Sequence, residues 1–147
     1  MNYGRMVVVI ANLSHQKFLE IYGKVNNGTR IKITKDKMWI KKYGTDQADI
    51  AKLNYFELPD EWKNSRWLGA KMALDVLLKE IKLGNLLDEK FVEHASNAVH
   101  EEWLGRNSGN AKDEHKLSYE QLSEKAKEKD RLFVRAAIEI YEKEKKS

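Results

Sequence analysis

Apolar side chains recur at helical spacing in three segments of the second part of the chain, and this periodicity is the strongest constraint on the fold. The first segment begins at Pro59 and ends before Gly84. The second begins at Asp88 and ends in the polar, glycine-containing stretch 105–110, and the third begins near Ser123. Proline and acidic residues favour helix starts, and glycine favours helix ends. Three amphipathic helices are therefore predicted.

The first 58 residues show a different pattern, which predicts strands. Residues 6–11 form a short β-branched, apolar run. Asn27 and Gly28 form a pair that accepts positive φ in a tight hairpin turn. Residues 30–34 and 38–43 alternate apolar and basic side chains, as the strands of a half-exposed antiparallel sheet do.

These patterns predict an α+β fold in a single domain, residues 1–147. We expect residues 1–58 to be mainly β-sheet and residues 59–147 to be mainly α-helical. A chain of 147 residues is long enough to bury a core without covalent cross-links. The apolar run of residues 6–11 is too short to span a bilayer or to serve as a signal peptide, so we expect no membrane contact and a cytoplasmic location.

Composition excludes several classes of protein. The sequence contains no cysteine, which excludes a disulfide scaffold, a cysteine-ligated zinc site and a thiol nucleophile. Its formal net charge is only +4 although 34% of its residues are charged, which argues against a protein that coats nucleic acid. We therefore expect nucleic acid to be an unlikely partner.

The positive charge is concentrated near the N-terminus, where the first 50 residues carry nine basic and four acidic side chains. One interpretation is a sheet edge whose lysines prevent pairing with other chains. The other is a patch that attracts an anion, including a weak nucleic-acid site. The residues concerned are Arg30, Lys32, Lys35, Lys37, Lys41 and Lys42.

The chain also contains an internal similarity. Residues 55–74 align without a gap on residues 119–138, with matching tyrosine, leucine, lysine and alanine positions. Chance similarity between helical segments is one explanation, and duplication is the other. If the segment is duplicated, each copy supplies a tyrosine turn followed by a helix that bears a cation.

No catalytic motif is evident. The histidines are not spaced as zinc ligands in the H-E-x-x-H manner, and neither a nucleophile elbow nor a glycine-rich phosphate loop is present. Adjacent acids such as Glu101 and Glu102 diverge around a helix and cannot act on one bond. We therefore expect no enzymatic activity, no metal and no cofactor.

A binding site is suggested by one pair of arginines and one tryptophan. Arg131 and Arg135 lie one helical turn apart, so both guanidinium groups project from one helix face and are able to grip two phosphates. Trp103 precedes a polar loop, where its indole is able to stack on a nucleobase. The alternatives are a salt-bridged arginine pair, with Asp130 and Glu139 as partners, and a tryptophan in the core.

The spacing of these residues resembles the ryanodine-receptor-like (RyR) repeat domain. A His-x-x-Trp helix is followed by a Tyr-x-x-Leu turn and a Lys-x-x-Asp-Arg helix start, within residues 91–141. Ser123 stands where that family prefers proline, and residues 105–116 lack the family's usual loop elements. The matching residues are His100, Trp103, Tyr119, Leu122, Lys127, Asp130 and Arg131.

A short chain with an N-terminal sheet and such a helical domain is similar to the first type of phage Thoeris anti-defence family. The resemblance implies a sponge that binds a cyclic ADP-ribose isomer, glycocyclic ADP-ribose, or cyclic oligonucleotides, without cleaving them. It implies a homo-oligomer, from dimer to hexamer, in the host cytoplasm. The ligand-binding residues it implies are Trp103, Arg131, Arg135, Asn107, Asn110, His100, Tyr119 and Lys127. The alternatives are a non-catalytic protein-interaction module and a weak nucleic-acid binder.

Overall fold

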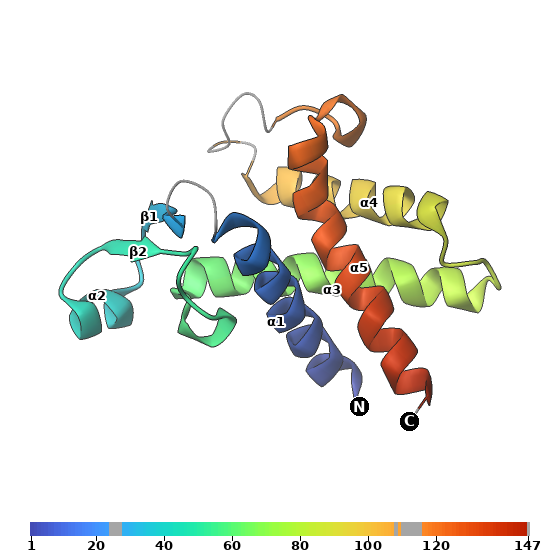
Figure 1. Cartoon of the computed structure of the whole chain (residues 1–147), viewed down its shortest axis with the longest axis horizontal. Helices are drawn as coiled ribbons and strands as arrows, with labels where there is room; N and C mark the ends of the chain where they lie inside the picture. Colours follow the sequence, from blue (N-terminus) through green and yellow to red (C-terminus); the bar gives the residue numbers. More distant parts are fainter. Residues whose placement is uncertain (24–27, 108, 110–115, 147) are drawn as a thin grey trace.

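The computed structural model of the chain describes residues 1–23, 28–107, 109 and 116–146 (Figure 1). These residues form a mostly helical fold with one small antiparallel sheet. The elements are α1 (Tyr3–Tyr22), β1 (Ile31–Ile33), α2 (Lys37–Tyr43), β2 (Gln47–Asp49), the 3-10 turn η2 (Tyr55–Glu57), α3 (Asp60–Lys82), α4 (Glu89–Asn107), the 3-10 turn η4 (Tyr119–Gln121) and α5 (Glu124–Lys146).

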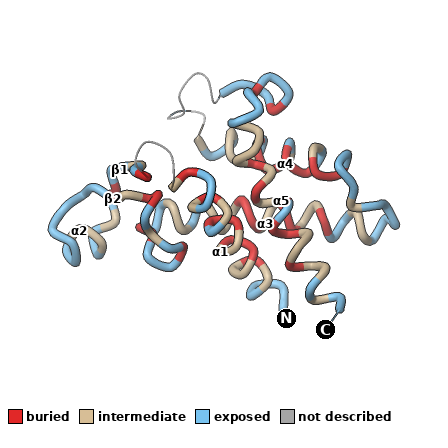
Figure 2. The backbone as a smooth tube through the Cα atoms, in the orientation of Figure 1, coloured by how far each residue is buried: buried red, intermediate tan, exposed pale blue. Residues whose placement is uncertain are grey.

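Four long helices enclose the core. α1 and α4 each pack against both α3 and α5, and α3 packs against α5. The buried positions follow the facing sides of these four helices, whereas the segment from β1 to β2 projects from one end and is mostly exposed (Figure 2). The chain ends lie close together, because the N-terminal ammonium of Met1 is 2.8 Å from Oε2 of Glu144. Among the described residues, no helix is long and apolar enough to cross a membrane.

The strand predicted at residues 6–11 is wrong, because these residues lie inside α1. The side chain of Asn2 caps this helix by accepting a hydrogen bond from the Arg5 amide. The buried residues of α1 recur along the sequence with the period of a helix. The buried face of α1 consists of Val7, Ile10, Ala11, Ser14, His15, Phe18 and Tyr22. Burial of this face against α3 and α5 outweighs the modest β-preference of a valine run.

The predicted N-terminal sheet is much smaller than expected. β1 pairs antiparallel with β2, with Ile31 opposite Asp49. Residues 38–43, predicted as a strand, lie in helix α2 instead. The Asp36 carboxylate caps this helix by accepting from two backbone amides, and Gly44 ends it with φ +68°. Residues 1–58 are therefore not mainly β-sheet. Asn27 lies outside the described residues.

The three predicted helices are confirmed. α3 begins after Pro59, and Gly84, with φ +78°, follows its end. The Asp88 carboxylate accepts from an amide at the start of α4, and the Ser123 hydroxyl does the same at α5. α4 continues through Gly105 to Asn107, slightly beyond the predicted break.

The internal similarity corresponds to a structural repeat. In each copy a long helix is followed by a 3-10 turn with a capping box and then by a second long helix: α1, η2 and α3 form the first unit, and α4, η4 and α5 form the second. The contacts between the units are reciprocal, since α1 packs on α5 as α4 packs on α3. Such reciprocity is the pattern of two units related by an approximate twofold axis.

The two units meet closely at Gly69 of α3. A Cβ atom added at Gly69 would lie 2.8 Å from Cζ of Phe133, which occupies the equivalent position in α5. That distance is far inside van der Waals contact. Glycine at this point therefore lets the two helices approach, and the Phe133 ring fills the space.

We expect Gly69→Ala to destabilise the protein by up to about 2 kcal/mol. The added methyl group overpacks the contact with Phe133 at a cost of about 1–3 kcal/mol, which is offset in part by the roughly 1 kcal/mol that alanine contributes in a helix interior. Gly105→Ala is the matched control, since a Cβ there meets nothing within 4 Å, and it should be neutral or stabilising. Urea denaturation of both variants measures the difference. Equal effects would show that close approach at Gly69 is unimportant.

Candidate functional site

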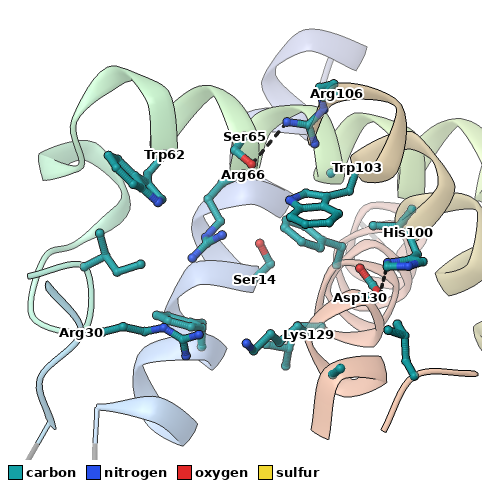
Figure 3. Close-up of a pocket in the computed structure, with 18 of the residues that line it drawn as sticks. Ser14, Arg30, Trp62, Ser65, Arg66, His100, Trp103, Arg106, Lys129 and Asp130 are labelled. Atoms are coloured by element: carbon teal, nitrogen blue, oxygen red, sulfur yellow. Dashed lines mark hydrogen bonds and ion pairs between the residues drawn. The ribbon is translucent and has the colours of Figure 1, made fainter. Parts of the chain in front are cut away.

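A cavity of about 240 Å³ lies between the two units (Figure 3). Both long helices of each unit contribute to its walls, Arg30 adds to them from just before β1, and Lys32 adds to them from β1 itself. Aromatic rings and cationic groups dominate the lining. Figure 3 shows Arg66, Trp103 and Lys129 around the opening between the helices.

Three of the cations that line the cavity lie over two aromatic rings at one of its sides. The Arg66 guanidinium carbon is 4.9 Å from the ring centroid of Phe18. The Arg30 guanidinium carbon lies 5.7 Å from the same ring and 5.4 Å from that of Tyr22, and Lys129 Nζ lies 5.6 Å from the Tyr22 ring. Ring faces attract cations, so Phe18 and Tyr22 hold these groups close to one another.

The charges of these three cations lie close to one another in the cavity wall. Within the described parts of the chain, no carboxylate forms an ion pair with Arg30, Arg66 or Lys129. Burial and the charge of Arg30 lower the pKa of Arg66 to about 10. Burial, followed by Arg30 and Lys125, lowers the pKa of Lys129 to about 8. A bound anion would relieve this repulsion, so the cluster has the electrostatics of an anion site.

The buried His15 is held in its neutral form beside this cluster. Its Nε2–H donates to the Leu53 carbonyl at 2.7 Å, and its Nδ1 accepts from Arg66 Nε at 3.4 Å. Burial and the charge of Arg66 lower the pKa of His15 to about 4. Its ring stacks with that of Phe18 at a centroid distance of 5.5 Å.

The second unit has an equivalent histidine, whose neighbour is a carboxylate where His15 has a guanidinium group. His100 Nε2–H donates to the Leu117 carbonyl at 2.7 Å, and its Nδ1 faces Asp130 Oδ2 at 3.4 Å. Burial alone would lower the pKa of His100, but the Asp130 and Leu117 contacts outweigh it and raise that pKa. The ring stacks with that of Trp103 at 6.1 Å and an interplanar angle of 14°.

Of the sequence-predicted binding residues that the structure describes, only His100 and Trp103 line the cavity. Trp103 is partly buried and stands at the cavity wall, so it is not part of the closed core. Asn107 lies at the end of α4, where its side-chain amide donates to the Trp103 carbonyl at 3.0 Å. Asn110 lies outside the described residues.

The predicted phosphate-binding arginines lie away from the cavity, in ion pairs with glutamates. Arg131 Nη2 is 2.6 Å from Glu93 Oε1, and its Nη1 is 2.8 Å from Glu124 Oε2. Arg135 Nη1 is 3.2 Å from Glu89 Oε1. Both are salt-bridged, but the partners are not the acids that the sequence suggested.

Tyr119 and Lys127 belong to the same network. The Tyr119 hydroxyl donates to Glu93 at 2.8 Å, and burial, together with that bond, raises its pKa to about 12. Lys127 Nζ lies 5.4 Å from the Tyr119 ring centroid and 3.7 Å from Glu124. These contacts fasten η4 and the start of α5 to α4, so the residues act in the framework of the second unit.

Sequence reasoning missed the cation cluster. Arg30 and Lys32 were included in the N-terminal basic patch, for which an anion site was one of two interpretations, but Arg66 and Lys129 were not singled out. The alignment of the two units contained a usable signal, because Arg66 aligns with Asp130 of the recognised motif. A change from acid to base at an equivalent position indicates that the two sides of a shared cavity differ in charge.

Comparisons with protein-family models, with curated proteins and with solved structures find no match to this chain. Among the described residues, no group of three histidine, cysteine, aspartate or glutamate side chains is placed to hold a metal ion.

We expect His15 to make the protein sensitive to acid. Its pKa is about 4 when folded and about 6.5 when unfolded, so the unfolded chain takes up a proton first as the pH falls. The contribution of neutral His15 to the unfolding free energy is fully present above pH 6.5 and is lost as the pH falls toward 4. Between pH 7 and pH 4 the wild type should lose about 3 kcal/mol more of its unfolding free energy than His15→Gln, whose amide retains a donor for the Leu53 carbonyl.

Chemical denaturation at several pH values measures this difference. Subtracting the curve of the variant removes the contribution of carboxylates common to both proteins. Parallel curves for the two proteins would contradict a neutral, buried His15.

Proposed function

We propose that this protein binds a cyclic ADP-ribose-type nucleotide in the cavity between its two units and sequesters it without cleaving it. The phosphate site consists of Arg30, Arg66 and Lys129, in place of the arginine pair that sequence spacing suggested. The observation that carries the proposal is the convergence of these three cations without a carboxylate partner in the described structure.

The charge of the cluster supports a phosphate-bearing ligand. Guanidinium groups bind phosphate oxygens in bidentate geometry, and a lysine adds a point charge. A doubly charged pyrophosphate neutralises more of the mutual repulsion than a single carboxylate would. The partial burial of Arg66 and Lys129 strengthens these interactions, because water screens them less than it screens surface charges.

The aromatic lining supports a ligand that also carries a nucleobase. Trp103 presents a large ring at the cavity wall, and Phe133 lies in the same lining. Stacking on such rings contributes about 1–3 kcal/mol per base. A cavity of about 240 Å³ is slightly below the usual range for small-molecule sites, so it encloses part of a cyclic dinucleotide-sized ligand and leaves the remainder at its mouth.

The biological role follows from the family that the sequence resembles. A sponge of this kind removes an immune signal in the host cytoplasm and needs affinity, which preorganised cations and rings supply. The resemblance supports a non-catalytic role.

We expect isothermal titration calorimetry to detect the binding of cyclic ADP-ribose isomers and to distinguish the contributions of Arg66 and Arg135 to the affinity. Arg66→Gln should weaken binding by about 10- to 100-fold, because it removes charge-assisted hydrogen bonds worth about 1.5–3 kcal/mol. Arg135→Gln makes the same chemical change outside the cavity and should leave affinity within about twofold of wild type. If Arg135→Gln weakened binding more than Arg66→Gln, the phosphate site would instead be the arginine pair of α5.

Two controls complete this experiment. Lys129→Gln should weaken binding, whereas Lys79→Gln, an exposed change on α3, should not. Ligand recovered from heat-denatured complex should be intact by mass spectrometry. A cleaved product would overturn the non-catalytic role, and folded protein that binds no cyclic nucleotide would overturn the function as a whole.

A second candidate function is protein interaction, including self-association. The segment from β1 to α2 exposes apolar side chains, with Met38 81%, Ile33 58% and Ile31 49% exposed. Exposed apolar groups on and beside a small two-stranded sheet are typical of an interface. We propose that this segment contacts a second copy of the chain, in accord with the oligomer that the resemblance implies.

We expect light scattering to find a dimer or larger assembly at micromolar concentration. Ile33→Lys should shift the protein toward monomer, since it places a charge in the apolar contact. Leu86→Lys is the matched control, because Leu86 is 79% exposed between α3 and α4, far along the chain from β1. A monomeric wild type would exclude self-association through this segment.

A further inference from the structure

His15 of α1 contacts a cation of the cavity without lining the cavity itself. The side chain of His15 is buried, and Arg66, which it contacts, belongs to the lining. His15 Nε2 lies 2.7 Å from the Leu53 carbonyl oxygen, an atom that only accepts hydrogen bonds, so Nε2 carries a proton. In the neutral ring Nδ1 is then an acceptor, and the donor Arg66 Nε lies 3.4 Å from it.

This contact fixes the Arg66 side chain on one side, while a ring face contacts it on another. The Arg66 guanidinium carbon is 4.9 Å from the ring centroid of Phe18, and the Phe18 ring in turn stacks on that of His15. Figure 3 shows Arg66 pointing from α3 into the cavity. The contact with His15 engages only the Nε–H, so it does not compete with a phosphate for Nη1 and Nη2, the nitrogens of a bidentate grip.

The second unit places the same ring nitrogen against the equivalent position of its second helix. His100 donates from Nε2 to the Leu117 carbonyl, and its Nδ1 is 3.4 Å from Asp130 Oδ2. Asp130 aligns with Arg66 in the ungapped alignment of the two units. Each framework therefore fixes one histidine nitrogen on a backbone carbonyl and directs the other toward this position of the second helix. In the first unit the residue there is a cation of the proposed phosphate site.

We propose that His15 is a positioning residue, which holds the Arg66 guanidinium in its phosphate-binding orientation through Nδ1. This inference rests on the proposed nucleotide-binding function, and His15 acts in it through Arg66. A protonated ring would turn a donor and a positive charge toward Arg66, so positioning requires neutral His15. Burial and the charge of Arg66 lower the pKa of His15 to about 4, which keeps the ring neutral at pH 7.

Two substitutions at His15 separate this role from the support that the residue gives to the fold. Glutamine reaches the position of Nε2 and keeps the donor for the Leu53 carbonyl, but it has no acceptor at the position of Nδ1. Asparagine is shorter, so its carbonyl oxygen replaces Nδ1 as the acceptor for Arg66, while the bond to Leu53 is lost.

Calorimetric titration at pH 7 with inorganic pyrophosphate, and with cyclic ADP-ribose, measures the effect of each substitution. His15→Gln should weaken binding of both probes by about 3- to 10-fold, because Arg66 must then be ordered when the ligand binds. His15→Asn should bind within about twofold of wild type, although its urea unfolding midpoint should be the lower of the two because the Leu53 carbonyl loses its partner. Weaker binding by His15→Asn than by His15→Gln would overturn the inference.

A double-mutant cycle shows whether His15 acts through Arg66. In the Arg66→Gln background, His15→Gln should cause no further loss of affinity, because no guanidinium remains to be positioned. Equal losses in the two backgrounds would mean that His15 affects the cavity through the fold alone, which would contradict the positioning role. His94→Gln, an exposed change on α4, is the matched control and should leave affinity within about twofold of wild type.

A measurement on the wild type keeps the test decisive if a variant does not fold. Nitrogen–proton correlation spectra at pH 7 should show His15 with its proton on Nε2 and a lone pair on Nδ1. Saturating pyrophosphate should shift the Nδ1 resonance, since the ligand contacts the guanidinium whose Nε–H this nitrogen accepts. A proton on Nδ1, or an Nδ1 resonance that pyrophosphate does not move, would exclude the positioning role.

The outcomes separate this inference from the function on which it rests. If wild type binds both probes and His15→Gln binds them as tightly, the positioning role is wrong while nucleotide binding stands. If folded wild type binds neither pyrophosphate nor cyclic ADP-ribose, both proposals fail.

Discussion

The structure depends on a hydrogen bond from a buried histidine to a loop carbonyl, and this bond occurs twice. His15 donates to the Leu53 carbonyl and His100 donates to the Leu117 carbonyl, each at 2.7 Å. Each bond fastens the backbone just before a 3-10 turn to the first helix of its unit, and the turn then sets where the second helix begins. Loss of such a bond leaves a carbonyl without a partner, which is more costly than the bond itself is stabilising. The two bonds thereby fix the frameworks between which the cavity lies.

The same framework shifts the pKa values of its two histidines in opposite directions. Burial and the charge of Arg66 lower the pKa of His15, whereas the contacts of His100 with Asp130 and the Leu117 carbonyl outweigh burial and raise its pKa. The equivalent position of the two units holds Arg66 in one and Asp130 in the other, so the two histidines face a base and an acid. The segment from β1 to β2 follows Arg30 in the chain, and Arg30 joins Arg66 and Lys129 in the cavity lining.

Much of the helical part was predictable because its signals are local. Asp88 and Ser123 cap helices in the structure as in the sequence. The N-terminal part was predicted wrongly for two reasons. The valines before Ile10 were read by their β-preference although the buried positions of α1 have a helical period, and the Asp36 cap and Gly44 stop of α2 were overlooked. Tertiary burial overrides local preference in the first case.

The sequence by itself determined the helices after Pro59, and it showed the internal similarity and the His-x-x-Trp motif, because short spacings encode caps, periods and turns. Only the tertiary structure decided which arginines form ion pairs with carboxylates. Arg131 and Arg135 face glutamates of α4, with Glu124 also beside Arg131, and so are engaged in the framework. Arg66 faces the other cations of the cavity. These pairings depend on distances between side chains remote in sequence, and the charge pattern along one helix does not specify them.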